Sequence, residues 1–84
     1  MHSSLPVTVR YFNQTQKARV QLPVSLKIEQ LIQEIQKRWN LPLDVNYAVR
    51  LDRTGQQLDP SIIVMELSLE ENDILDIYPI PEAG

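Results

Sequence analysis

Cysteine is absent from the 84-residue sequence. This absence excludes a disulfide framework, a thiol nucleophile, a thiolate zinc site and an iron–sulfur cluster, and it favours the cytosol over secretion. Long apolar runs are also missing. The longest, at 62–65, has four residues, whereas a membrane span needs about 20. The first residues lack the basic and then apolar pattern of a signal peptide. We therefore expect a cytoplasmic protein without a membrane segment.

Residues suited to catalysis or metal binding are few. The one histidine, His2, stands at the start of the chain, where a rigidly held side chain is not expected. Glu70, Glu71 and Asp73 are close in sequence but lack the spacing and the glycine of a calcium loop. Gly55 stands alone, so there is no glycine-rich phosphate loop. The sequence therefore predicts a protein that is not an enzyme and has no metal or other cofactor.

Basic residues are missing from the second part of the chain. All eight lie in 1–53, which carries a net +4, whereas 54–84 carries −7. An acidic chain without a basic, aromatic-rich stripe is a poor nucleic-acid binder, so we expect no nucleic-acid partner. The acidic residues of 54–84 have two interpretations, as solvated turns that aid solubility or as a docking face for a basic partner.

Alternation of apolar and polar residues predicts four strands. They lie at 7–12, 18–22, 47–52 and 74–78. The polar turn at 13–16 joins the first two as a hairpin. The segment 57–60 is at most a very short strand, and 61–69 has room for a helical turn.

An apolar stripe at helical spacing predicts one helix within 25–40. The stripe consists of Ile28, Leu31, Ile32, Ile35 and Trp39. Ser25 is the expected N-cap. Asn40 can adopt the left-handed conformation that ends a helix, and Pro42 prevents the helix from resuming.

The helix has one apolar stripe and the sheet of four or five strands has one apolar face, so the two close a single core. Eighty-four residues suffice for one domain of this kind. The sequence therefore predicts an α+β fold in two layers, with the helix packed across a mixed sheet. The residues expected to be buried are Val7, Val9, Val20, Leu22, Ile28, Leu31, Ile35, Val49, Leu51, Leu69, Leu75 and Ile77, and Met65 is expected to fill the core.

Four stretches resemble the ubiquitin-like β-grasp family in order and spacing. They are "KIEQLIQEI", "NLPLD" with Asn40 where ubiquitin has a glycine, "GQQLDP", and "VMELSLEENDILDIY". The resemblance covers roughly 7–84. It implies a monomeric β-grasp domain at 1–78 and an exposed C-terminal tail at 79–84.

The outward positions of the third and last strands depart from ubiquitin. In ubiquitin these positions form an apolar docking patch, whereas here they are Arg50, Asp76 and Tyr78. We therefore expect a polar partner surface at these three residues, and partners that differ from those of ubiquitin.

The sequence ends in Pro81, Glu82, Ala83 and Gly84, where the family's usual final pair is Gly-Gly. The resemblance implies a protein modifier, which is activated with ATP, passed to a thiol and joined through Gly84 to an amine by an isopeptide bond. Its partners would be activating and conjugating enzymes. Two alternatives stay open. One is a non-covalent interaction module of the GTPase-binding or secretion-system accessory type, and the other is a sulfur-carrier protein.

Overall fold

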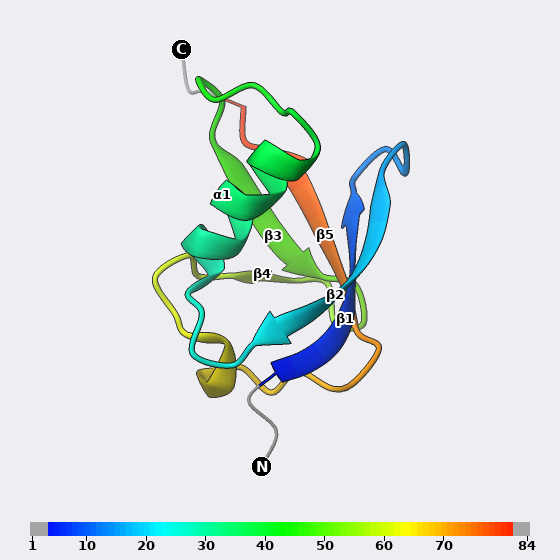
Figure 1. Cartoon of the computed structure of the whole chain (residues 1–84), viewed down its shortest axis with the longest axis vertical. Coiled ribbons are helices and arrows are strands. Elements are labelled where there is room, and N and C mark those ends of the chain that lie inside the picture. Colours follow the sequence, from blue (N-terminus) through cyan, green and yellow to red (C-terminus); the bar gives the residue numbers. More distant parts are fainter. Residues whose placement is uncertain (1–3, 82–84) are drawn as a thin grey trace.

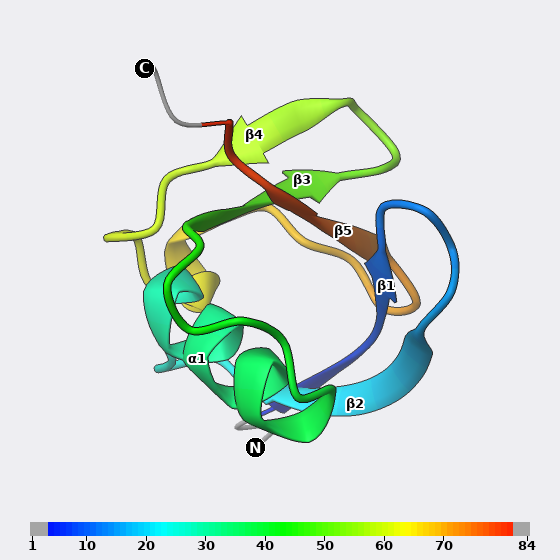
Figure 2. The same cartoon turned by 90° about the horizontal axis from the view of Figure 1, so that it is seen from above.

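The computed structural model describes residues 4–81, which form a mixed sheet of five strands and one α-helix, α1 (Ile28–Arg38). The helix lies across one face of the strongly twisted sheet, so the molecule has two layers (Figures 1 and 2). This confirms the predicted α+β class and the predicted packing of the helix across the sheet.

All the predicted strands are present, and their order in the sheet is β2-β1-β5-β3-β4. Their bounds are β1 (Ser4–Tyr11), β2 (Lys17–Pro23), β3 (Tyr47–Leu51), β4 (Gln56–Leu58) and β5 (Ile74–Pro79). Strands β1 and β5 are parallel, and the other neighbouring pairs are antiparallel. β5 therefore lies in the middle of the sheet, held on both sides.

The helix begins three residues after the predicted N-cap, so the assignment of Ser25 is wrong. The N-cap is Lys27, whose backbone N–H donates to Oε1 of Gln30 at 3.0 Å. The next backbone N–H groups donate to carbonyls of the 60–62 segment, at 3.1 Å for Ile28 and 2.9 Å for Glu29. A distant part of the chain thus accepts hydrogen bonds from the free backbone N–H groups of the first turn, a role that a serine side chain at the N-cap would otherwise take. The predicted end of the helix is confirmed, because Asn40 has φ of 53°.

The core lies between α1 and the sheet. Ten of the twelve residues expected to be buried are buried, and Val20 and Leu69 pack against the core while remaining partly exposed. Val20 is on the edge strand β2, which has a neighbour on one side. Met65 is 66% exposed, so its assignment to the core is wrong. The short 3₁₀ helix η1 (Val64–Glu66) turns Val64 inward instead.

Candidate protein-interaction surface

The sheet face opposite α1, called the outer face below, carries the residues predicted to meet a partner. Arg50 on β3 and Tyr78 on β5 alternate with the core residues Val49 and Ile77, which places them on this face. The guanidinium carbon of Arg50 lies 5.6 Å from the ring centroid of Tyr78. This distance permits a cation–π contact.

Tyr78 also forms a hydrogen bond with a residue of β4, the strand on the other side of β3. Its hydroxyl donates to Oε1 of Gln57 at 3.1 Å. Gln57 on β4 is paired with Arg50 in the sheet register. Arg50 is exposed and Tyr78 is half-buried. The three side chains therefore form a polar, partly ordered patch at the β3–β4 side of the outer face.

Asp76 shares this face but is only 2% exposed. It is covered by Arg10 on β1, whose Nε and Nη2 donate to the two carboxylate oxygens at 2.7 and 3.0 Å. Arg10 Nη2 also donates to Oδ1 of Asp52 at 3.2 Å. The hydrogen bond with Asp76 is the main reason why the pKa of Arg10 is raised above its ordinary value. Asp76 is therefore shielded from solvent. At this position the outer face presents Arg10, which covers Asp76, and Asp52, which is bonded to Arg10.

Sequence analysis missed Arg10 and Asp52. The alternation in β1 indicates that Arg10 faces outward, but it does not reveal which strand lies beside β1. The parallel pairing of β1 with β5 puts Arg10 opposite Asp76, 66 positions apart in sequence.

No protein-family model and no curated protein matches the sequence. Among solved structures, 388 chains are similar. The ubiquitin of Caldiarchaeum subterraneum matches with a TM-score of 0.77 at 10% identity, over 96% of this chain and 99% of that one. The C-terminal ubiquitin-like domain of mouse tubulin-specific chaperone e matches at 0.72 and 18% identity, over 99% and 94%. A chain of the toluene 4-monooxygenase HD complex with the inhibitor 4-bromobenzoate matches at 0.78 and 16%, over 93% and 100%.

The chain has the ubiquitin-like β-grasp fold. Sequence identities of 10% to 18% support a shared fold. A shared fold does not define an activity, which depends on the residues of this protein's own surface.

A second ion pair stabilises the polar loop that precedes β5 in this β-grasp. Arg53 donates from Nε and Nη2 to the carboxylate of Asp73 at 3.0 and 3.2 Å. The backbone N–H of Glu70 also donates to Asp73, at 2.8 Å. The hydrogen bonds from Arg53, together with that from Glu70, hold the pKa of Asp73 below its ordinary value, against the opposing effect of its burial. The pair fixes the 70–73 turn rather than offering a free charge to a partner.

The root of the predicted tail is tied to the β-grasp body. Pro79 is the last residue of β5 and pairs with Tyr47, and the backbone N–H of Ile80 donates to the carbonyl of Asn46 at 2.8 Å. Pro81 is exposed. The other predicted tail residues, Glu82, Ala83 and Gly84, lie outside the described residues, so the division into 1–78 and 79–84 remains a prediction.

Three further features of residues 4–81 bear on the kinds of site that this part of the chain can form. No three His, Cys, Asp or Glu side chains in this part gather closely enough to hold a metal ion. No helix in the same part is long and apolar enough to cross a membrane. Every buried side-chain nitrogen and oxygen there has a hydrogen-bond partner. The outer face and the root of the tail are the described surfaces that the sequence predicted.

Proposed function

We propose that this ubiquitin-like protein is a non-catalytic protein modifier that is activated and conjugated through Gly84. The observation that carries the proposal is the attachment of the tail. β5 is hydrogen-bonded between β1 and β3, and Ile80 is bonded to Asn46. Gly84 is thus four residues from a rigid body, a span of at most about 14 Å. An enzyme that binds the body would have the proposed conjugation site at Gly84 within a defined reach.

The residue types of the tail suit this chemistry. In activation, the carboxylate of Gly84 attacks the α-phosphate of ATP and pyrophosphate leaves, which gives an acyl adenylate. A thiolate then displaces AMP, and an amine displaces the thiol to form the isopeptide bond. Glycine has no Cβ to block these attacks. Ala83 adds little bulk beside it, and Pro81 limits the conformations of the segment.

The outer face is the surface proposed to select the partner. Arg50 and Tyr78 offer a cation and an aromatic ring, and Asp76 acts through Arg10 and Asp52. A partner whose charges are complementary to these would recognise this arrangement, because charge complementarity contributes to specificity. We propose activating and conjugating enzymes as the partners of a cytoplasmic monomer, with neither nucleic acid nor a membrane among them.

The second candidate is a non-covalent interaction module, of the GTPase-binding or secretion-system accessory type. Two of the similar structures favour this candidate. One is a domain of tubulin-specific chaperone e, and the other is a chain of a toluene 4-monooxygenase complex. A sulfur-carrier protein is a variant of the first candidate, because it shares the adenylation step and then receives sulfur at the terminal carboxylate.

The deciding experiment compares wild type with Gly84→Val, and uses Met65→Val as the matched control at an exposed position on η1. Each protein is incubated with ATP and the cognate activating enzyme, and the adenylate or thioester is read by intact mass. We expect Gly84→Val to keep its melting temperature but to lose activation, because a β-branched residue crowds the carbonyl. Met65→Val should be activated like wild type.

Two outcomes would contradict conjugation. One is equal activation of Gly84→Val and wild type, and the other is failure of a Gly84-directed trap to capture an activating enzyme from host lysate. A thiocarboxylate on the intact mass would identify the sulfur carrier. Intact mass of the protein from its own cells adds a further test, because a polypeptide that continues into another domain favours the interaction module.

A further inference from the structure

An open groove of about 410 Å³ lies between α1, the loop 41–46 and the residue that follows β5. The helix wall is formed by Glu29, Ile32, Gln33 and Gln36. This i, i+3, i+4, i+7 spacing defines one helix face, which shares Ile32 with the apolar stripe that packs on the sheet. The groove is therefore on the helix side of the molecule, away from the outer face.

The walls of the groove are held together by hydrogen bonds. Nε2 of Gln36 donates to the carbonyl of Pro42 at 3.3 Å, which ties the loop to the helix. The N–H of Ile80 donates to the carbonyl of Asn46 at 2.8 Å, which ties the same loop to the end of β5. A groove whose walls are already fixed needs little ordering when a partner binds, and this favours affinity.

The rim of the groove exposes two large apolar side chains. Leu43, in the turn that follows the helix, is 80% exposed, and Ile80 is 41% exposed. Both line the groove, and half-buried Ile32 and Val45 contribute to its wall. An apolar side chain inserted between Leu43 and Ile80 would remove both from water, which stabilises a complex in proportion to the area buried.

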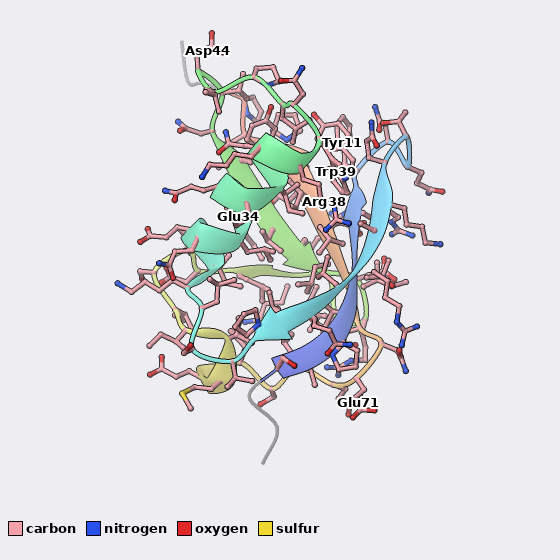
Figure 3. The ribbon with its side chains drawn as sticks, viewed as in Figure 1. Tyr11, Glu34, Arg38, Trp39, Asp44 and Glu71 are labelled. Atoms are coloured by element: carbon pink, nitrogen blue, oxygen red, sulfur yellow. The ribbon has the colours of Figure 1, made fainter. Side chains whose placement is uncertain are left out.

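The charge of the groove indicates what should accompany that apolar side chain. Among the described residues that line it, Glu29 is the one charged side chain, and neither lysine nor arginine is present. Asp44 follows Leu43 directly and lies at the tip of the loop (Figure 3). The carboxylate of Glu29 in the wall and that of Asp44 beside the exposed Leu43 favour a partner whose apolar residue is flanked by cations.

We propose that this groove docks a segment of a partner protein that carries an apolar side chain flanked by lysine or arginine. The proposal goes beyond the reaction at Gly84, since the groove belongs to the folded body and serves either candidate function. It also gives the acidic protein a binding site for a basic partner, on a different face from Arg50 and Tyr78.

The test is a titration of isotope-labelled protein with the peptide acetyl-KRLLRK-amide, followed by two-dimensional NMR up to about 5 mM peptide, because millimolar binding corresponds to weak but real docking. We expect shifts at the backbone amides of Leu43 and Ile80 and at the side-chain amides of Gln33 and Gln36. The matched peptide acetyl-EELLEE-amide replaces the cations with carboxylates, and acetyl-KRGGRK-amide replaces the two leucines with glycine. Each should bind at least about fivefold more weakly.

Variants with matched controls separate docking from folding. Leu43→Ser should weaken the KRLLRK peptide about tenfold, and Met65→Ser, at a similarly exposed apolar residue, should not. Glu29→Gln should weaken it about threefold. Glu71→Gln, at the opposite end of the molecule from Asp44 (Figure 3), should have no effect.

The proposal fails if no shifts appear at the groove, or if they map to the outer face. It also fails if the acidic peptide binds as well as the basic one, if Met65→Ser weakens binding as much as Leu43→Ser, or if the groove residues report self-association of the protein in place of peptide binding.

Discussion

Arg10 and Asp76 form a bidentate ion pair across the parallel strands β1 and β5, with Nε–Oδ1 and Nη2–Oδ2 distances of 2.7 and 3.0 Å. The two partners differ in exposure, because the Asp76 side chain is 3% exposed and that of Arg10 is 22% exposed. Arg10 also has a second partner in Asp52. Loss of either partner should therefore have unequal consequences.

We predict that Arg10→Ala destabilises the fold more than Asp76→Ala does. Arg10→Ala leaves a buried carboxylate without its cation, which should cost about 2–4 kcal/mol. Asp76→Ala leaves a partly exposed arginine that still reaches Asp52, which should cost about 1–2 kcal/mol. Urea unfolding of both variants and of the double variant measures the difference. Equal losses, or a smaller loss for Arg10→Ala, would show that Asp76 does not depend on Arg10.

Acid should weaken the 70–73 turn through Asp73. Its pKa is lowered in the folded protein, chiefly by hydrogen bonds from Arg53. A group whose pKa is lowered on folding contributes stability above its unfolded pKa, and this contribution is lost as the pH falls through the folded pKa. We therefore expect the unfolding free energy to fall below about pH 5. Asp73→Asn should lower stability at pH 7 and flatten this dependence.

Urea midpoints at a series of pH values from neutral to acid measure both effects. Asp59 is the control, because hydrogen bonds with Ser61 also lower its pKa while its side chain stays at the surface. Asp59→Asn should change the slope less than Asp73→Asn. An unchanged acid slope in Asp73→Asn would refute the assignment.

Ile35 should be one of the residues on which the core depends. It is 3% exposed and belongs to the helix stripe that faces the sheet. Ile35→Ala should cost about 2–5 kcal/mol, because it removes buried methyl groups and leaves a cavity. Leu43→Ala, at an 80% exposed position, should change stability by less than about 0.5 kcal/mol. A loss below about 0.5 kcal/mol for Ile35→Ala in urea melts would mean that the helix face is misassigned.

Receptors that read the apolar patch of ubiquitin should not bind this protein. The corresponding part of the outer face holds exposed Arg50 beside Tyr78, with Arg10 covering Asp76. Burying Arg50 in an apolar interface would remove water from its guanidinium without providing a charge partner, which is unfavourable. Titration with such a receptor should show no binding. Tight binding that disappears in Arg50→Ala would overturn this prediction.

The sequence alone determined the two layers and most of the core. Alternation of apolar residues with period two indicates one buried face for each strand, and the stripe from Ile28 to Ile35 does the same for the helix. Asn40 marked the end of the helix because its side chain tolerates positive φ, which the structure has at 53°. These signals are local, since they depend on the geometry of a few neighbouring residues.

The tertiary structure decided the features that join distant segments. The helix starts at Ile28 and not near Ser25 because carbonyls of the 60–62 segment accept its first N–H groups. Asp76 is buried because the parallel pairing of β1 with β5 brings Arg10 across it. The groove beside Leu43 exists because Ile80 is bonded to the loop that follows the helix. Periodicity specifies which face a side chain is on, but the neighbour it finds there depends on strand order, which no local pattern encodes.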